Sequence, residues 1–388
     1  MINPLVQTSE KIKYLVLSDI HLGHKRNTTR EILFNLTVYL DYLSPNSRFK
    51  DLDILFIAGD LFDQAMWVTD DDVVLIQQFA SRLMKMCEHF GIRLRILEGT
   101  PSHDNHQPRI LVPLAATYKK LDFRYVETMC IESFTDLGIT CLYMPDEFGG
   151  SALEAQRLIQ EEMDNLHLEQ VDIAILHGMF KYQLPEIASE RFKLDEEFFL
   201  KRVKAFINIG HVHIYTTYER ILAQGSFDRL SHGEEGPKGA IYIELHPQGN
   251  SFYFVENTRA KKFVTCHVKT PDLEKAVAQV RKIASKLPDD AYLRIKTTKS
   301  HPVFTVFDMI SKEFLMLTFT KITEEEESER QQLLDGNELL DMNYTPVQIH
   351  KENIVEMIMT EMRNNANQDN IFAMSDLLVL EQQLKDLV

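Results

Sequence analysis

The most constraining feature of the sequence is a recurring pattern in which a short apolar run ends in aspartate or histidine. Its first copy lies in residues 11–24, KIKYLVLSDIHLGH, where apolar residues around 14–17 give way to Ser18, Asp19 and His21. Such a run predicts a buried parallel strand. In an extended segment, Asp19 and His21 would point the same way because they are two residues apart. A carboxylate and an imidazole that project together make half of a divalent-metal site.

The same pattern returns in residues 50–63, 91–104, 171–178 and 204–213. Each polar residue alone has an ordinary explanation, such as a turn aspartate or a structural histidine. Chance is a poor explanation for the whole set, and we therefore expect a shared site. The predicted strand ends supply Asp19, His21, Asp60, His103, His177, His211 and His213.

These side chains can converge, because ligands of open α/β sheets bind outside the carboxyl ends of the strands. A mixture of carboxylates and imidazoles suits Mn²⁺, Fe or Zn²⁺ better than Mg²⁺ or Ca²⁺. In the third copy, His103 followed by Asp104 predicts a general acid held by a carboxylate.

The motifs resemble those of the calcineurin-like metallophosphoesterases, whose pattern is D-x-H, G-D, N-H-D, H and G-H-x-H. More narrowly, residues 59–63 and 225–239 are similar to the SbcD branch, the nuclease subunits of double-strand-break repair complexes. The resemblance implies an α/β fold, a metallophosphoesterase β-sandwich flanked by helices, over residues 1–258. It further implies a small α/β capping domain over 259–323, an acidic linker over 324–344 and a helical partner-binding tail over 345–388.

The local patterns after residue 258 agree with this division. They predict strands over 263–268, 291–297 and 315–322 and helices over 272–287 and 303–314. A plain accessory α/β domain is the alternative for this segment. Apolar spacing in the tail predicts two amphipathic helices, which either dock on another chain or pack internally.

The resemblance also implies a role for each site residue. One ion would be held by Asp19, His21, Asp60 and His213, and a second by Asp60, His177 and His211, with Mn²⁺ the expected metal. His103 would orient the phosphate or protonate the leaving oxygen. The sequence departs from the family at Ser102, which follows an inserted Thr-Pro where the family has a ligating Asn. A serine hydroxyl is a weaker and shorter ligand, and Asn105 is an alternative to it.

The function implied is that of a hydrolase, a metal-dependent DNA exonuclease and endonuclease. It would be the catalytic subunit of an SbcCD-type end-processing complex, bound through its C-terminal helices to an SbcC-type ATPase and paired as a homodimer. Two alternatives are a stand-alone phosphoesterase for small phosphodiesters or phosphomonoesters, and a non-enzymatic scaffold that recruits the ATPase.

Composition limits the partners. The 388 residues carry 42 basic and 58 acidic side chains, a net charge of −16, which argues against non-specific binding of DNA or membrane by the whole surface. Metal ions and a partner subunit could supply the missing positive charge. The absence of a membrane-length apolar run, a signal peptide or paired cysteines predicts a cytoplasmic or nucleoid-associated protein that is not secreted.

Overall fold

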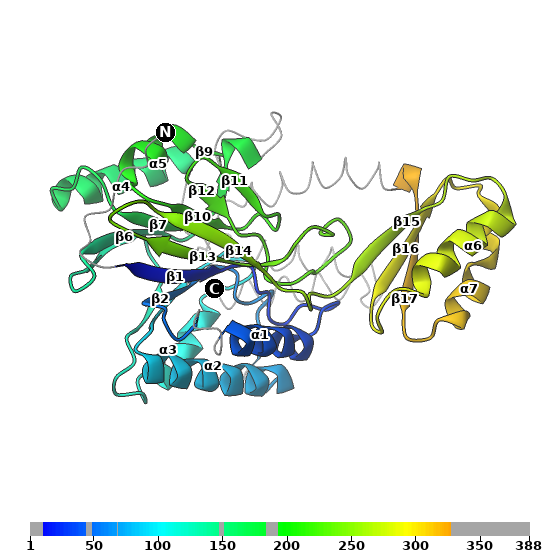
Figure 1. The fold of residues 1–388 in the computed structure, drawn as a ribbon, viewed down its shortest axis with the longest axis horizontal. Helices are drawn as coiled ribbons and strands as arrows, with labels where there is room; N and C mark the ends of the chain where they lie inside the picture. The colour runs from blue at the N-terminus through cyan, green and yellow to red at the C-terminus, as the bar shows by residue number, and fades with distance from the viewer. Residues whose placement is uncertain (1–10, 44–48, 68, 147–150, 184–192, 327–388) are drawn as a thin grey trace, which may run out of the picture. The chain divides into compact units, whose positions relative to one another are not determined.

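The chain forms two six-stranded sheets in a computed structural model that describes residues 11–43, 49–67, 69–146, 151–183 and 193–326 (Figure 1). The first sheet has the order β14 (Ser251–Glu256), β13 (Gly239–Leu245), β1 (Ile12–Leu17), β2 (Ile54–Ala58), β3 (Arg93–Leu97), β4 (Phe123–Val126). The second has the order β11 (Thr216–Tyr218), β12 (Ile221–Ala223), β10 (Ile207–Gly210), β7 (Ile173–His177), β6 (Ile139–Met144), β5 (Cys130–Phe134).

The strands that precede the candidate site residues are the central, parallel strands of these sheets. β1, β2 and β3 pair in parallel in the first sheet, and β7 and β10 do so in the second. All residues of β2, β7 and β10 are buried, as expected for parallel strands covered on both faces. Their carboxyl ends therefore lie at one edge of each sheet.

The segment 123–143 differs in part from the sequence pattern, whose loose alternation predicts antiparallel strands. β5 and β6 are antiparallel, as predicted. β4, however, pairs in parallel with β3 and extends the first sheet at its edge. Alternation reports which face of a strand is buried, and it does not distinguish the direction of the neighbouring strand.

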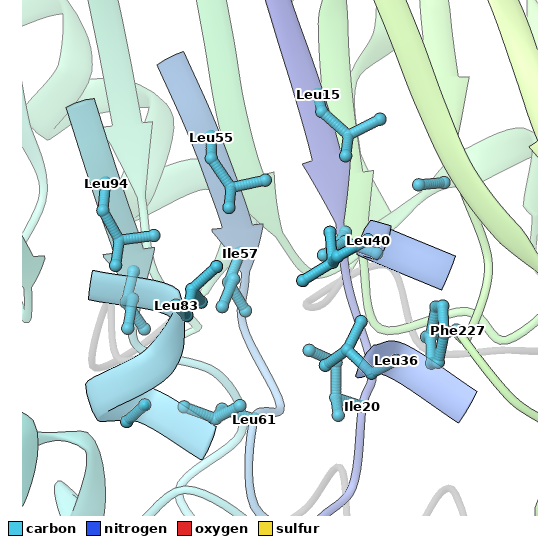
Figure 2. Close-up of a cluster of buried hydrophobic side chains, with 14 of the residues drawn as sticks. Leu15, Ile20, Leu36, Leu40, Leu55, Ile57, Leu61, Leu83, Leu94 and Phe227 are labelled. Atoms are coloured by element: carbon cyan, nitrogen blue, oxygen red, sulfur yellow. The ribbon is translucent and has the colours of Figure 1, made fainter. Parts of the chain in front are cut away.

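Alternate residues along each central strand enter different cores. Tyr14 and Val16 pack with Phe56, Tyr143 and other side chains between the two sheets. Leu15 and Leu17 face the other way, into a cluster with helices α1 (Thr29–Leu43), α2 (Asp71–Phe90) and α3 (Leu111–Ala115) (Figure 2). Each fully buried leucine contributes about 1.5–3 kcal/mol to stability.

The second sheet has its own helical layer, formed by α4 (Ala152–Asn165) and α5 (Glu196–Arg202). Leu142, Leu176 and Phe199 are among the side chains that fill this cluster. A short two-stranded sheet, β8 (Met179–Phe180) with β9 (Lys193–Leu194), lies beyond β7 in the chain. The predicted fold class, two packed β-sheets flanked by helices, is confirmed for the described residues.

Residues 263–323 fold around a separate apolar cluster and a three-stranded parallel sheet, ordered β15-β16-β17. The elements are β15 (Phe263–His267), α6 (Leu273–Ala284), β16 (Tyr292–Thr297), the 3₁₀ helix η4 (Pro302–Val306), α7 (Phe307–Glu313) and β17 (Thr318–Thr323). The strands and the first helix agree with the sequence patterns. The helix predicted over 303–314 is instead divided between η4 and α7. The assignment of this unit as a capping domain stays a prediction.

Residues 324–326, at the start of the predicted acidic linker, are helical. Thr323 and Glu326 form a reciprocal capping box, in which each side chain accepts from the other residue's backbone N–H at 3.0 Å. The remaining linker and the predicted tail, 345–388, lie outside the described residues.

Cys87, Cys130, Cys141 and Cys266 are all free thiols. No helix within the described ranges combines the length and the apolar character needed to cross a membrane.

Candidate metal centre

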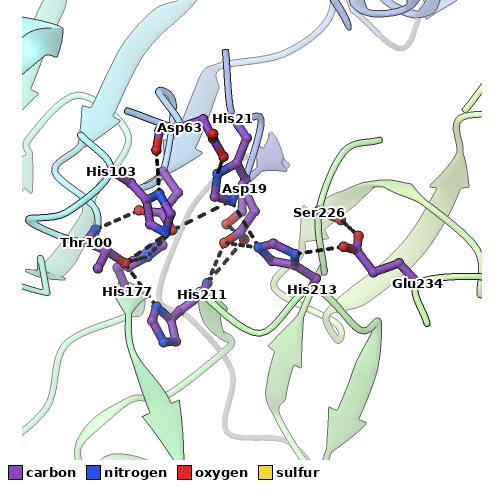
Figure 3. Close-up of polar contacts among 12 residues, drawn as sticks. Asp19, His21, Asp63, Thr100, His103, His177, His211, His213, Ser226 and Glu234 are labelled. Atoms are coloured by element: carbon purple, nitrogen blue, oxygen red, sulfur yellow. Dashed lines mark hydrogen bonds and ion pairs between the residues drawn. The ribbon is translucent and has the colours of Figure 1, made fainter. Parts of the chain in front are cut away.

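The seven residues at the predicted strand ends lie together, and they come from both large sheets (Figure 3). Asp19 and His21 follow β1, Asp60 follows β2, and His103 lies on the loop after β3. The second sheet contributes the last residue of β7 and two residues after β10, namely His177, His211 and His213. The site therefore forms where the carboxyl edges of the two sheets meet, as the sequence analysis predicts for ligands of an α/β protein.

The side chains form three overlapping groups, within each of which the candidate ligand atoms lie no more than 4.8 Å apart. Asp60 belongs to two groups and faces His177 Nε2 at 3.3 Å and His21 Nε2 at 3.8 Å through the same oxygen, Oδ2. The groups are Asp19, His21 and His213; His21, Asp60 and His103; and Asp60, His177 and His211.

The donor set fits a cation. His21 Nε2 and His213 Nε2 lie 3.0 Å apart. Two N–H groups cannot face each other at this distance, so in neutral rings at least one of the two nitrogens has no proton and directs its lone pair at the other ring. His213 Nε2 also lies 3.8 Å from Asp19 Oδ1. Carboxylate oxygens and imidazole nitrogens this close together are ligands that transition-metal ions prefer. The buried His and Asp groups can thus hold a metal ion.

The backbone, and not the strand alternation, brings these ligands together. β1 ends at Leu17, and φ is positive at Asp19 (51°), His21 (54°), Asp60 (49°) and His211 (98°). The expectation that Asp19 and His21 project together from an extended segment is therefore wrong, although both reach the site. A left-handed conformation at a residue other than glycine costs about 1–3 kcal/mol and is concentrated at functional sites.

Gly59 allows the Asp60 backbone to adopt its left-handed conformation beside the His177 ring. Its φ is 84°, and a Cβ at Gly59 would lie 2.2 Å from His177 Nδ1. Both the backbone turn and the close approach of the His177 ring therefore require glycine.

Each of four histidine rings is oriented through its Nδ1 atom. His177 Nδ1 lies 2.8 Å from the Ala58 carbonyl, and His103 Nδ1 lies 2.7 Å from the Asp63 carbonyl. Because a carbonyl only accepts, Nδ1 carries the proton in both rings, and Nε2 of the neutral ring is free to ligate.

Carboxylates orient the other two rings. Asp63 Oδ1 lies 3.1 Å from His21 Nδ1, and Glu234 Oε1 lies 3.4 Å from His213 Nδ1. Partners of this kind fix the ring and raise its basicity as a ligand. Neither Asp63 nor Glu234 is among the residues the sequence analysis selected, although both lie in segments, 59–63 and 225–239, that carry the SbcD resemblance.

The Asp104 carboxylate does not hold the His103 ring, and it contacts two backbone N–H groups instead. The sequence pattern predicts that its carboxylate holds His103, whose Nδ1 instead meets the Asp63 carbonyl. Asp104 is fully buried and accepts from the backbone N–H groups of Phe62 and Gly99, both at 2.8 Å. It therefore ties the loop after β2 to the loop after β3. Burial and the charge of Asp60 raise the pKa of Asp104 well above its ordinary value.

Ser102 does not lie with the ligand groups. Its side chain is exposed, as is Asn105, and among the described residues Ser102 makes no hydrogen bond to the site. The hydroxyl that reaches Asp60, His177 and His211 belongs to Thr100, a residue that the sequence analysis treats only as part of an insertion. Its position directly after Gly99 is the sequence signal that could have identified it.

Electrostatics tie Asp60 and His177 into one pair. Burial opposes ionisation of Asp60, but the His177 imidazole beside it holds the pKa of the carboxyl well below its ordinary value. Burial likewise opposes protonation of His177, yet Asp60 raises its pKa well above the ordinary value. Burial lowers the pKa of His211. Because a metal ligand must be deprotonated, a cation bound at this pair would compete with a proton for His177.

Comparisons with known proteins identify no family. No family model matches the chain, and no curated protein matches it. Among solved structures, TT1561 of Thermus thermophilus has a TM-score of 0.37 at 11% identity, covering 63% of this chain and 99% of that chain. A second crystal structure has a TM-score of 0.39 at 12% identity, covering 63% of this chain and 100% of that chain. TM-scores this low do not establish a shared fold.

Proposed function

We propose that the chain is a metal-dependent DNA phosphodiesterase, the nuclease subunit of an SbcCD-type DNA-end-processing complex. The observation that carries this proposal is the convergence of imidazole and carboxylate groups that share the Oδ2 atom of Asp60. Two divalent ions, with Mn²⁺ the expected metal, would be held by Asp19, His21, Asp60 and His213 and by Asp60, His177 and His211.

The chemistry that two such ions supply when bound is activation of a water and neutralisation of the phosphodiester charge. Two side chains have further roles in the proposed reaction. Asp60 presents one oxygen to both groups, since Thr100 N–H binds its other oxygen at 2.6 Å. His103 keeps a proton on Nδ1 through the Asp63 carbonyl, so its Nε2 can carry the proton that the leaving oxygen needs. No protein nucleophile is required.

DNA as the substrate rests on the resemblance of residues 59–63 and 225–239 to the SbcD branch. The net charge of −16 suits a subunit whose DNA contacts lie partly on a partner. An SbcC-type ATPase bound by residues 345–388, a homodimer and a cytoplasmic or nucleoid-associated location belong to the same proposal.

Deletion of 345–388 should abolish binding of the ATPase and spare hydrolysis of a small diester. A truncated protein that still binds the ATPase would exclude the tail as the docking segment.

The first experiment is cleavage of end-labelled linear duplex DNA by the purified full chain with Mn²⁺, beside a small chromogenic phosphodiester. Both substrates should be cleaved, and a chelator should stop both reactions. Asp60→Asn removes the shared carboxylate and should abolish both activities, whereas His167→Asn, at an exposed histidine after α4, should leave them unchanged.

The alternative is a stand-alone phosphoesterase for small substrates, and the same experiment separates it. Cleavage of the small diester without cleavage of DNA, even after the ATPase subunit is added, would contradict the nuclease proposal. Metal binding without hydrolysis of either substrate would favour the scaffold.

A further inference from the structure

Thr100 lies at the group formed by Asp60, His177 and His211, and neither the sequence motifs nor the family pattern gives it a role. We propose that Thr100, and not Ser102, supplies the oxygen ligand that completes this group. The inference rests on the metal centre of the proposed function and names the residue that stands in for the family's asparagine.

The distances around the Thr100 hydroxyl carry the proposal. Oγ1 lies 3.1 Å from His211 Nδ1, 3.3 Å from His177 Nε2 and 3.2 Å from Asp60 Oδ2. With metal–ligand bonds of about 2.0–2.1 Å, adjacent ligand atoms around one cation are about 3.0–3.4 Å apart. These three distances, together with the 3.3 Å between His177 Nε2 and Asp60 Oδ2, match the spacing of ligands that share one ion.

With His177 neutral, as a metal ligand must be, hydrogen bonds alone account for this arrangement less well. A hydroxyl carries one proton and can donate to only one of its three neighbours. When His177 is neutral, its Nδ1 proton is engaged by the Ala58 carbonyl, so the Nε2 lone pair faces the hydroxyl oxygen. A cation among the four atoms would accept a lone pair from each.

The backbone fixes Thr100 in this place. Its N–H donates to Asp60 Oδ1 at 2.6 Å, which leaves Oδ2 as the oxygen nearest His177. The preceding Gly99 permits this approach, because a Cβ there would lie 2.1 Å from the Asp60 backbone nitrogen. The Thr100 residue thus holds one carboxylate oxygen with its amide and faces the other with its hydroxyl.

The turn that follows excludes Ser102 from the same role. The Thr100 carbonyl accepts from the N–H groups of His103 at 2.9 Å and Asp104 at 3.0 Å. This turn returns His103 to the site and leaves Ser102 on its exposed outer side. The inserted residues therefore lengthen the loop outward and leave Thr100 next to the ligands.

A threonine hydroxyl makes the two ion positions unequal. The proposed ligands of the first ion include two carboxylates, Asp19 and Asp60. The group of Asp60, His177 and His211 has one carboxylate, to which Thr100 would add a neutral oxygen. The second ion should therefore bind more weakly, and two affinities should be resolved in a titration.

The test is calorimetric titration of the metal-free full chain with Mn²⁺, without any substrate. Thr100→Val removes the hydroxyl at nearly constant shape and should weaken one of the two ions by about 10–100-fold while the other is unchanged. Thr100→Ser retains the hydroxyl and should bind both ions nearly as the wild type does. Ser102→Ala is the matched control in the same loop and should change neither affinity.

Three results would overturn the proposal: wild-type affinities in Thr100→Val, weakened binding in Ser102→Ala, or a wild-type protein that binds one ion only. Circular dichroism checks that each variant is folded, and Thr100→Ala replaces Thr100→Val if the valine variant does not fold. The readout is ion binding and not cleavage, so failure of the nuclease proposal is measured separately and does not alter this result.

Discussion

At the scale of single residues, His103 has two possible roles that one substitution separates. It shares a candidate ligand group with His21 and Asp60, but its Nδ1 bond to Asp63 also suits a general acid. We expect His103→Ala to reduce cleavage of the small diester by about 10²–10⁴-fold, the usual contribution of a general acid, with metal content nearly unchanged. His106→Asn, in the same loop, is the control. Loss of bound metal together with activity would show that His103 is a ligand.

The residues that the sequence could and could not predict differ in a physical way. The candidate ligands Asp19, Asp60, His177 and His211 lie at or just after the ends of buried strands, and a continuous apolar run marks such strands in any sequence. The residues that contact these side chains, Asp63, Thr100 and Glu234, lie on loops. Their contacts depend on left-handed backbone positions and on pairs of loops from distant parts of the chain, which no local pattern encodes.

At the scale of the element, the loop between β12 and β13 supports His213 through a buried ion pair. The Lys238 side chain is 2% exposed, and its Nζ lies 2.8 Å from Glu234 Oε2, 2.6 Å from Ser226 Oγ and 2.8 Å from the His213 carbonyl. Burial opposes ionisation of Glu234, but His213 and Lys238 hold the pKa of its carboxyl well below its ordinary value. The loop thus positions His213 through both its carbonyl and its ring.

Glu234→Gln should destabilise the protein strongly, because it leaves the Lys238 charge buried without its partner. The expected loss is about 3–5 kcal/mol in the free energy of unfolding, measured by denaturant titration. Adding Lys238→Met should recover part of this loss, and Glu235→Gln, at the exposed neighbouring glutamate, is the matched control. Equal effects of Glu234→Gln and Glu235→Gln would show that the ion pair does not support the loop.

At the scale of the whole molecule, metal binding should stabilise the fold, because the ligand set exists only in the folded state. Free Mn²⁺ at a thousand times its dissociation constant should add about 4 kcal/mol to the free energy of unfolding. Scanning calorimetry should therefore show a higher melting temperature with Mn²⁺ and a reversal by chelator. Asp60→Asn, which removes the shared carboxylate, should lose most of this gain. A gain of the same size in that variant would place the stabilising ion elsewhere.

The sequence predicted the fold class of the molecule, but it did not predict which strands pair with one another. Apolar runs predicted the central strands, but they carry no information on which strands share a sheet. β7 and β10 belong to the second sheet, and β13, more than 200 residues after β1 in the chain, pairs beside it in the first. Such pairings are decided by long-range packing, which a pattern of local burial leaves open.

The division of the ligands between two sheets has a consequence for how the protein is made. His21 and His213 are separated by 192 positions in the chain and face each other at 3.0 Å. Contacts of such high sequence separation form late, because closing the long loop is costly until other contacts hold its ends. During synthesis the emerging chain therefore has no complete ion site until both sheets have formed and docked. Acquisition of metal would be one of the last events in the assembly of the molecule, so an unfinished or misfolded chain would not hold the ion.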